Sequence, residues 1–315
     1  MSQATRMRAV LFPGQGSQEI GMGRDIAERD AEAMELWKKA EKLCRASLRE
    51  IYWDGDQEAM AQTRYLQPAL AVTGLSIWQA CSLSRPDYLA GHSVGEFPAL
   101  TVAGALSSEE MLELVSLRGK LMFQAGESQA GKMAAIVKLD AAAVEEVVSQ
   151  AKSKSQGELV IANYNSPEQL VVSGSPEAVD EAGRLAKERK GRAMPLPVSG
   201  AFHSPLMQEA AEELARFMRK LSWGAANIPV HLNATASPET DADRLQDIME
   251  KQMISPVYWV QSMNDQWDKG VRHWLELGPK GVLVRLLKHI FKGRDDSWTA
   301  EFLDSAQKCD ALGDR

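Results

Sequence analysis

The sequence predicts an α/β protein in which a small subdomain is inserted into a larger domain built on a parallel sheet. Short apolar runs of strand length, of which Ala9–Phe12 is the first, alternate with longer stretches of helical periodicity. Turn residues bound a separate group of strands and helices between residues 131 and 198. With 315 residues, the chain is long enough to fold both units around sizeable cores.

The first third of the chain predicts elements of the larger domain. The run Ala9–Phe12 ends at Pro13-Gly14, which is typical of a buried strand followed by a turn. Helices are expected from about Met22 to Cys44 and from Gln67 to Cys81. Pro68 lies near the start of the second helix, where proline is tolerated.

Residues 131–198 predict the order β-α-β-β-α-β, which is the split βαβ arrangement of a ferredoxin-like subdomain. The expected elements are, in order, Met133–Val137, Ala141–Ala151, Leu159–Ala162, Gln169–Ser173, Pro176–Lys190 and Ala193–Val198. Turn glycines separate them.

The chain then returns to the larger domain. Further strands are expected at residues 229–233 and 273–277, and a closing helix at residues 281–291. The expected boundaries are therefore 1–130 with 199–291 for the large domain and 131–198 for the insert. The polar residues 292–315 are expected to be a frayed or disordered tail.

Composition excludes several classes of protein. A net charge of −7 argues against non-specific nucleic-acid binding, which needs a basic surface. No segment approaches the ~20 uninterrupted apolar residues of a membrane span, and residues 1–8 lack the apolar stretch of a signal peptide. Cys44, Cys81 and Cys309 are scattered, so neither a disulfide framework nor a zinc site is expected. We expect a cytoplasmic monomer that binds neither nucleic acid nor membrane.

The pentapeptide Gly91-His92-Ser93-Val94-Gly95 matches the pattern G-x-S-x-G. The apolar-rich segment Pro86–Ala90 precedes it and a helical stretch follows, which is the context of a nucleophile elbow. In an elbow, glycines on both sides allow a strained turn that presents the serine hydroxyl at the end of a sheet. Helix N-terminal amides nearby receive negative charge. A chance match at a glycine-rich helix entry is the alternative interpretation.

Arg118 interrupts an apolar helix stripe. Ser107 and Glu110 have the spacing of a capping box, and the apolar stripe of the helix that follows includes the position of Arg118. A buried guanidinium needs an anionic or strongly accepting partner. The partner is either a glutamate or backbone carbonyl of this chain, or the carboxylate of a substrate. Sequence pattern alone favours the structural partner.

His203, in Ala201-Phe202-His203-Ser204, follows a predicted strand and a turn at Gly200. Serine catalysis requires a base that accepts the hydroxyl proton and returns it to the leaving group. Among the five histidines, His92 adjoins the serine and is expected to face away from it, while the others lie in predicted regular elements (His231, His273, His289). His203 is therefore the expected base, although a surface loop histidine would look the same in the sequence.

The turn Gly14-Gln15-Gly16-Ser17-Gln18 follows the first predicted strand. It is neither a P-loop nor a full dinucleotide-binding fingerprint. Beside an elbow, such a glycine-rich loop supplies the second donor to an oxyanion.

These segments together resemble the malonyl-CoA:acyl carrier protein transacylase family, which includes the acyltransferase domains of polyketide synthases. The resemblance spans about residues 8–291. Its motifs occur in order as Phe12-Pro13-Gly14-Gln15-Gly16-Ser17-Gln18, Gly91-His92-Ser93-Val94-Gly95-Glu96, Arg118-Gly119-Lys120-Leu121-Met122, Asn163-Tyr164-Asn165-Ser166-Pro167 and Gly200-Ala201-Phe202-His203-Ser204.

The resemblance implies an α/β-hydrolase-like large domain with a ferredoxin-like insert, and a role for each motif. Ser93 would carry the malonyl group from malonyl-CoA, and His203 would be the base and acid. Gln15 and the backbone N–H of Val94 would form the oxyanion hole. Arg118 would bind the malonyl carboxylate.

The resemblance also implies supporting residues and partners. A backbone carbonyl orients the histidine in this family, and the matching position here is Gln252; Asn165 and His92 are expected to support the site. The acceptor would be the phosphopantetheine thiol of an acyl carrier protein, so neither a resident cofactor nor a metal is expected. Pro98 stands in the helix after the elbow, where family members carry serine or alanine, and a proline in a helix interior is costly.

Several alternatives remain at this stage. The same elbow serves acyl-thioester hydrolases and esterases, although a neutral acyl group would leave the charge of Arg118 unmatched. A malonyltransferase subunit of a malonate decarboxylase or polyketide system would use the same chemistry, and a carrier-docking subunit without turnover is a further class. The basic cluster Lys187, Arg189, Lys190 and Arg192 is a candidate carrier-docking surface or a solvated helix end.

Overall fold

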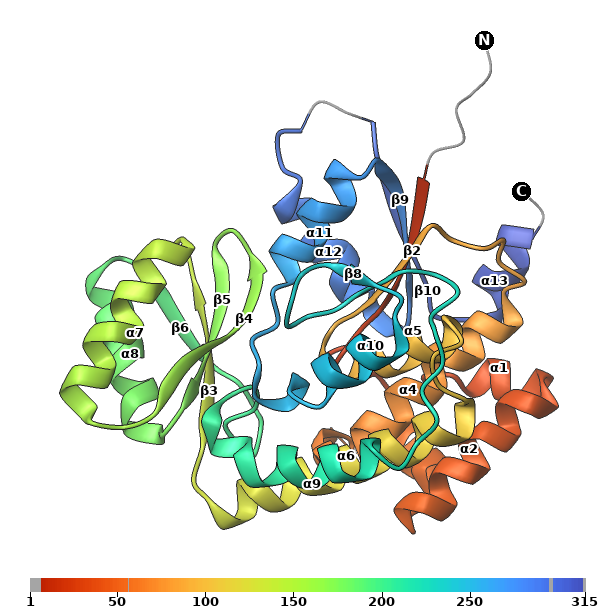
Figure 1. Ribbon diagram of the computed structural model, residues 1–315, viewed down its shortest axis with the longest axis horizontal. Helices are drawn as coiled ribbons and strands as arrows, with labels where there is room; N and C mark the ends of the chain where they lie inside the picture. Colours follow the sequence, from red (N-terminus) through yellow and green to blue (C-terminus); the bar gives the residue numbers. More distant parts are fainter. Residues whose placement is uncertain (1–6, 56, 295–296, 314–315) are drawn as a thin grey trace.

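The computed structural model describes residues 7–55, 57–294 and 297–313, and these residues form two sheets (Figure 1). The larger sheet has the strand order β10-β9-β1-β2-β7-β8, and only its β7–β8 pair is antiparallel. The smaller sheet is antiparallel, with the order β4-β5-β3-β6. The fold is therefore mixed α/β, with a parallel core and a separate antiparallel sheet, as the sequence predicted.

The strands of the larger sheet are β1 (Met7–Phe12), β2 (Tyr88–Gly91), β7 (Val230–His231), β8 (Pro238–Glu239), β9 (Val271–Leu277) and β10 (Thr299–Leu303). Phe12 pairs with Gly91, and Leu11 pairs with Glu276. The parallel strands β1, β2 and β9 therefore end at the same edge of the sheet. The loops that follow these three strands meet there.

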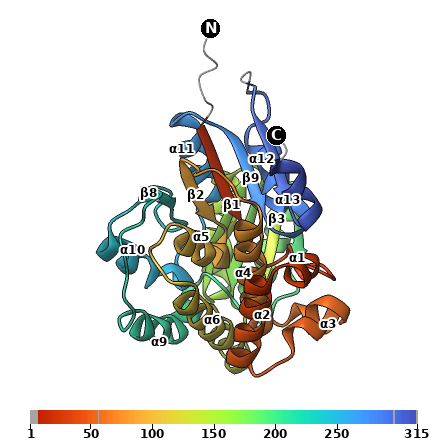
Figure 2. The same cartoon turned by 90° about the vertical axis from the view of Figure 1, so that its right-hand side faces the viewer.

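Helices cover both faces of this sheet because β1 is apolar on both sides. Val10 and Phe12 belong to a core with helices α2, α4, α5 and α6, whereas Ala9 and Leu11 pack with α11 and α12 on the other face. The helices of this part are α1 (Arg24–Arg29), α2 (Ala31–Cys44), α3 (Gln57–Ala61), α4 (Thr63–Ala80), α5 (Glu96–Val102), α6 (Ser108–Ser128), α9 (Gln208–Met218), α10 (Ala242–Met249), α11 (Trp259–Asp268), α12 (Val282–Ile290) and α13 (Ala306–Gly313). Figure 2 shows α1, α2 and α4 on the side of the molecule away from the antiparallel sheet.

The antiparallel block contains β3 (Lys132–Val137), α7 (Ala141–Ser155), β4 (Leu159–Ser166), β5 (Gln169–Gly174), α8 (Pro176–Glu188) and β6 (Arg192–Pro195). This is the order predicted for residues 131–198. Helices α7 and α8 pack on one face of the sheet, where Ile136 and Val172 are fully buried (Figure 1). Met133, Ala135 and Val171 on the other face join the core of the larger part. The block is thus packed against the parallel sheet domain.

Two expected helices differ in their bounds. The stretch from Met22 to Cys44 forms two helices, because Asp30 is extended and its side chain caps α2 by accepting the N–H groups of Glu32 and Ala33. Helix α4 begins at Thr63, so Pro68 lies inside it. Pro98 is the third residue of α5, in the first turn, where its missing N–H has no intrahelical partner to lose.

The expectation of a frayed tail after residue 291 is wrong for the part of it that the structure describes. Strand β10 extends the parallel sheet beside β9, and Leu303 is buried. Helix α13 follows and packs on α4. No apolar run marks this strand in the sequence, because an edge strand buries only part of its side chains.

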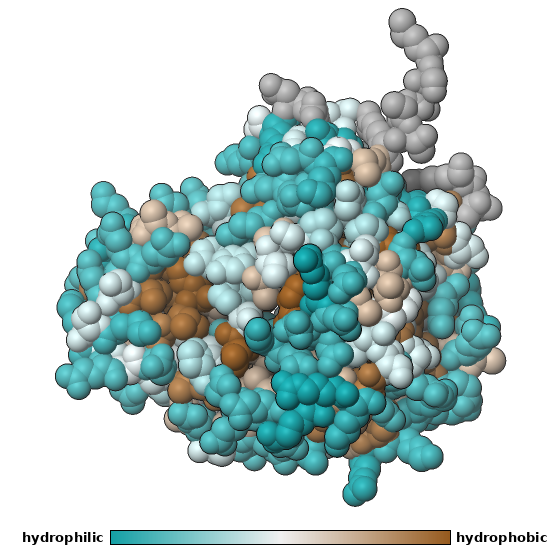
Figure 3. Space-filling view, in the orientation of Figure 1, coloured by the Kyte–Doolittle hydropathy of each residue, from teal (hydrophilic) through white to brown (hydrophobic). Residues whose placement is uncertain are grey.

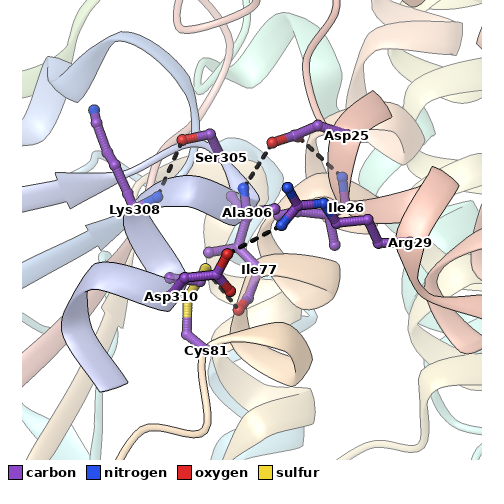
Figure 4. Close-up of a disulfide and its surroundings, with 10 residues drawn as sticks. Asp25, Ile26, Arg29, Ile77, Cys81, Ser305, Ala306, Lys308 and Asp310 are labelled. Atoms are coloured by element: carbon purple, nitrogen blue, oxygen red, sulfur yellow. Dashed lines mark hydrogen bonds and ion pairs between the residues drawn. A yellow bond between two sulfur atoms is a disulfide. The ribbon is translucent and has the colours of Figure 1, made fainter. Parts of the chain in front are cut away.

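The expectation of no disulfide is also wrong. Cys81, which caps α4, is bonded to Cys309 of α13 (Figure 4). The backbone N–H of Ala306 donates to Asp25, at 2.7 Å, and Arg29 pairs with Asp310 at 3.0 Å. The cysteines are 228 residues apart in the chain, so their pairing leaves no spacing signal.

Hydrophobic residues are visible at the surface of the antiparallel block and in the recess between that block and the larger part (Figure 3). Across the described residues, no helix is both long enough and apolar enough to span a membrane.

Candidate active site

Strand β2 leads into a strained turn at Ser93. The backbone of Ser93 has φ 53°, in the left-handed region, and a 3-10 turn over Ser93–Gly95 continues into α5. A Cβ on Gly91 would overlap the backbone of Gly95, and a Cβ on Gly95 would overlap the carbonyl of Phe12. The two glycines are therefore required by close backbone approach, and the strand-to-helix geometry predicted for a nucleophile elbow is present.

His203 lies against the hydroxyl of Ser93. The distance between Ser93 Oγ and His203 Nε2 is 2.7 Å, although the residues are 110 positions apart. His203 is itself held at φ 56° in the loop before the 3-10 turn Pro205–Met207. Its Nδ1 lies 2.9 Å from the carbonyl oxygen of Ser255. When Nδ1–H donates to this carbonyl, Nε2 carries the lone pair that accepts the Ser93 hydroxyl.

The carbonyl that holds His203 was expected at Gln252, and the hydrogen bond goes instead to Ser255, three residues further on. A 3-10 turn over Gln252–Ile254 precedes Ser255 and turns the chain toward the histidine. Two residues after Ser255, Val257 is bonded to strand β4: its N–H donates to the carbonyl of Ala162, and its carbonyl accepts from the N–H of Tyr164. The antiparallel block thus anchors the segment that orients the histidine.

Burial and the nearby charge of Arg118 lower the pKa of His203 to about 3. The carbonyl of Ser255 acts in the opposite direction, as does the backbone of Gln252 more weakly. His203 is therefore neutral at physiological pH, which is the form that accepts a proton.

Arg118 is 1% exposed and points toward Ser93 from helix α6. The capping box of Ser107 and Glu110 begins this helix, as predicted. Nη2 of Arg118 lies 3.2 Å from Ser93 Oγ, and Nη1 of the same guanidinium donates to Gln67 Oε1 at 2.7 Å. Burial lowers the pKa of Arg118 to about 10, and the charge of Glu96 opposes this shift. Among the described residues no carboxylate forms an ion pair with it, which leaves its charge available to a ligand.

Gln252 connects Arg118 with a buried carboxylate. Its Oε1 accepts from Arg118 Nη2 at 3.0 Å and from Nε at 3.3 Å. Its Nε2 donates to the carbonyl of Ser93 at 3.0 Å and to Glu96 Oε2 at 2.8 Å. Glu96 is fully buried, which raises its pKa to about 7.

The remaining predicted residues also lie at the cavity. Gln15 lines it and exchanges a hydrogen bond with Thr63 at 3.3 Å. Val94 is the second residue of the 3-10 turn, where backbone N–H groups lack an intrahelical partner. The expectation that His92 faces away from Ser93 is wrong: its ring lines the cavity, and its Nε2 lies 2.8 Å from Asn165 Oδ1 on β4. His92 and Asn165 thereby tie the elbow to the antiparallel block.

The cavity has a volume of about 130 Å³ and lies between the two sheets. Its walls come from both parts of the chain: Ser93, Arg118 and Phe202 from the larger part, and Met133 and Val171 from the antiparallel block. The serine, histidine and guanidinium lie together at this cavity, and the rest of its lining combines apolar side chains with polar ones such as Gln67 and Asn165. Such a cavity accepts a small acyl group that bears an anionic end.

Sequence analysis missed four residues of this arrangement. Gln67 holds Arg118, Ser255 holds His203, Asn233 accepts the N–H of Ser93 at 2.7 Å, and Glu96 holds Gln252. Glu96 belongs to the motif that follows the elbow, so it was visible without an assigned role. The others are polar residues of a predicted helix (Gln67), the end of a predicted strand (Asn233) and a segment without a predicted element (Ser255), and their pattern gives no local signal.

No group of three or more histidine, cysteine, aspartate or glutamate side chains could hold a metal ion within the described ranges. The arrangement itself supplies a hydroxyl with a neutral base, a fixed cation and helix N-terminal amides.

The comparisons with known proteins agree on one family. Residues 10–310 match the model of the acyl transferase domain. A malonyl CoA-acyl carrier protein transacylase of Bacillus subtilis is 39% identical over 286 residues, which is 90% of each chain. The crystal structure of an acyl carrier protein S-malonyltransferase from Vibrio cholerae aligns with a TM-score of 0.89 and 37% identity, over 97% of this chain and 99% of that one. A malonyl-transacylase in complex with a type II polyketide acyl-carrier protein aligns equally well, with 0.89 and 32% identity, over 98% of this chain and 100% of that one.

Proposed function

Because the chain belongs to the acyl transferase domain family of malonyl-CoA:acyl carrier protein transacylases, we propose that it transfers the malonyl group of malonyl-CoA to an acyl carrier protein and so supplies fatty acid synthesis. The contact of Ser93, His203 and Arg118 at a small cavity carries this proposal. The reaction proceeds in two halves through a malonyl ester of Ser93.

In the first half, Ser93 Oγ attacks the thioester carbon while His203 Nε2 accepts its proton. The negative charge that develops on the carbonyl oxygen is received by the N–H of Val94 and by Gln15. The tetrahedral intermediate collapses, the carbon–sulfur bond breaks, and the leaving thiolate of coenzyme A takes the proton from His203. Ser255 holds the imidazole in the tautomer that both steps require.

Arg118 selects the acyl group. The malonyl group carries a carboxylate two bonds from its thioester carbon, and the guanidinium lies within 3.2 Å of the nucleophile. A bidentate contact between the two satisfies a buried charge that has no carboxylate partner of its own. An acetyl group leaves that charge unmatched, which disfavours it.

In the second half, the phosphopantetheine thiol of the carrier protein enters after coenzyme A has left. His203 takes the thiol proton, the thiolate attacks the malonyl ester, and Ser93 recovers its proton as the ester bond breaks. The cofactor arrives on the partner, so the chain itself needs none. The complex of a similar malonyl-transacylase with its carrier protein supports the choice of partner.

We extend the proposal to the organisation of the chain. Residues 131–198 form a ferredoxin-like subdomain, which the strand order β4-β5-β3-β6 supports, inserted into an α/β-hydrolase-like domain of residues 1–130 and 199–291. The large domain also includes β10 and α13. We further propose that the enzyme is a monomer of the cytoplasm.

The test is intact-protein mass after brief mixing with malonyl-CoA or acetyl-CoA, followed by addition of a carrier protein that bears phosphopantetheine. We expect a malonyl adduct on the wild type, a much smaller acetyl adduct, and no adduct on Ser93→Ala. Addition of the carrier should remove the adduct and increase the carrier mass by a malonyl group.

Two outcomes would overturn the proposal. Release of coenzyme A with free malonate and no transfer to the carrier would identify a hydrolase. Equal yields of the two adducts would mean that Arg118 has a structural role and that the substrate assignment is wrong.

A further inference from the structure

Glu96 is a fully buried carboxylate that the reaction described above does not use. It does not line the cavity, and the described residues give it no ion-pair partner. Its oxygens accept two hydrogen bonds: one from the backbone N–H of Asn233 at 2.7 Å, and one from Gln252 Nε2 at 2.8 Å. The charge of Arg118 opposes the rise in the pKa of Glu96, but it makes no direct ion pair with this carboxylate. Such burial is costly, so the two hydrogen-bond partners indicate what Glu96 is for.

The first partner leads to the nucleophile turn. The side chain of Asn233 spans the elbow, because its Oδ1 accepts from Ser93 N–H at 2.7 Å and its Nδ2 donates to the carbonyl of Gly91 at 2.6 Å. Glu96 thus holds the backbone of a residue that clamps the strained turn on both sides.

The second partner leads to the cation. The amide of Gln252 lies between Glu96 and Arg118, and its orientation is set by what each side offers. Glu96 and the carbonyl of Ser93 are both acceptors, so the NH₂ group must face them. The oxygen must then face Arg118, where it accepts from Nη2 and Nε. An amide turned the other way would present donors to a guanidinium, which has no acceptor.

From this chain of contacts we propose that Glu96 is a positioning residue that fixes the amide of Gln252 and, through it, holds the guanidinium of Arg118 in the orientation that receives the substrate carboxylate. The proposal rests on the proposed malonyl transfer. The side chain of Glu96 contacts neither the hydroxyl of Ser93 nor the cavity lining among the described residues, so we expect its effect to fall on acyl-group selectivity more than on the chemistry of Ser93 and His203.

The substitution Glu96→Gln tests this directly, because it keeps the size of the side chain and replaces one acceptor by a donor. The backbone N–H of Asn233 cannot turn away, so the oxygen of the new amide faces it and the introduced NH₂ group faces the NH₂ of Gln252. If the amide of Gln252 turns to relieve this conflict, donors face Arg118 and its oxygen faces the carbonyl of Ser93. Either arrangement loosens the guanidinium.

The experiment measures the rate of acylation by malonyl-CoA and by acetyl-CoA across a range of concentrations. For Glu96→Gln we expect KM for malonyl-CoA to rise about tenfold. Acylation by acetyl-CoA should change less than about twofold, so the malonyl preference falls. In the Arg118→Ala background, Glu96→Gln should change the malonyl-to-acetyl ratio no further, because the two residues act through one contact.

Glu276→Gln is the matched control. Glu276, near the end of β9, is also fully buried and also has a pKa raised to about 7 by burial, but it accepts from the first turn of helix α12 and lies outside the cavity. Its substitution should leave the malonyl preference unchanged. An equal fall for malonyl-CoA and acetyl-CoA in Glu96→Gln, or an additive effect in the Arg118→Ala background, would overturn the proposal.

If Glu96→Gln does not fold, Gln252→Met removes the amide that joins Glu96 to Arg118 and should give the same selective loss. An unchanged malonyl preference in this variant would overturn the proposal. The wild-type measurement separates this proposal from the proposed function. A wild type that shows no malonyl preference contradicts the proposed substrate, whereas a wild type with the preference and a Glu96→Gln variant that keeps it contradicts only the positioning role.

Discussion

Two turns in the large sheet have the same local architecture and different surroundings. After β2 and after β9, the chain passes through a one-residue link and a 3-10 turn into a helix, and each turn contains a residue with positive φ, Ser93 at 53° and Lys280 at 65°. Each turn also lies beside a buried glutamate, Glu96 or Glu276. Local geometry therefore does not distinguish a nucleophile from an ordinary turn.

The surroundings of the two turns are what differ. The first faces the cavity, where His203 and Arg118 approach Ser93 from other segments. The second is covered by the C-terminal segment: Gly278 N–H donates to Leu303 at 2.9 Å, and the ring of Phe302 lies against Gly281. The comparison teaches that a strained strand-to-helix turn becomes a reactive site only where a base and a cation are brought to it.

Substitution of the positive-φ residue in each turn should give the largest difference in activity between the two turns. Ser93→Ala removes the nucleophile, and transfer to the carrier protein should fall by at least ~10⁴-fold. Lys280→Ala alters the corresponding exposed position of the second turn and should leave the rate within about twofold. Steady-state transfer of labelled malonyl groups measures both variants. Residual transfer by Ser93→Ala above ~1% of the wild type would mean that another group is acylated.

The cation gives the next contrast. Arg118→Ala should lower kcat/KM for malonyl-CoA by ~10²-fold or more while acetyl-CoA is affected far less, because only the malonyl group offers a carboxylate to the lost charge. Arg285, which donates to the carbonyl of Lys280 at the second turn, is the matched arginine. Arg285→Ala should leave both substrates unaffected, and an equal loss for both substrates in Arg118→Ala would instead indicate a structural role.

The lowered pKa of His203 can be tested through the pH dependence of acylation. With a pKa of about 3, His203 stays neutral from pH 8 to pH 5, and acylation by an uncharged ester such as 4-nitrophenyl acetate should change less than about twofold over this range. A histidine with an ordinary pKa of ~6.5 would lose activity about 30-fold by pH 5. The rate with Ser93→Ala is subtracted as background, and a midpoint near pH 6.5 would contradict the lowered pKa.

The C-terminal segment that covers the second turn should affect stability and leave activity unchanged. Cys309→Ser removes the cross-link between α4 and α13 and should lower the free energy of unfolding by about 3 kcal/mol, because a long loop of the unfolded chain is no longer closed. Reductant should lower the wild-type melting temperature to that of the variant, while Cys44→Ser keeps the response to reductant. Activity at 25 °C should be unchanged, since the segment does not line the cavity. A melting temperature that is indifferent to reductant would contradict this prediction.

The second buried glutamate gives the smallest contrast. Burial raises the pKa of Glu276 to about 7 in the folded state, above an ordinary value of ~4.5 in the unfolded chain. Between these values the folded state binds more protons, so its stability falls as pH rises from about 4.5 to 7. Glu276→Gln removes this contribution, and the fall in unfolding free energy between pH 5 and 7.5 should shrink by on the order of 2 kcal/mol. An unchanged slope in urea unfolding at the two pH values would show that the pKa is ordinary.

Local sequence patterns were sufficient for most of the elements. Short apolar runs, helical periodicity and turn glycines located β1, β2, β9 and the six elements of the antiparallel block within a few residues. The capping box located the start of α6, and the glycines of the pentapeptide located the strained turn. Each of these signals comes from residues a few positions apart, where steric and hydrogen-bonding preferences act directly.

The sequence by itself therefore determined the parallel core, the inserted block, the elbow and, through a family resemblance, the set of residues to examine. The packing of whole elements was needed to show that the carbonyl of Ser255 lies against His203, that His92 meets Asn165 at the cavity, that Gln252 joins Glu96 to Arg118, and that β10 covers the second turn. The side-chain contacts among these join residues 52 to 156 positions apart in the chain, as His203–Ser255 and Glu96–Gln252 show. Such pairings depend on how whole elements pack, and no local pattern of residue types records them.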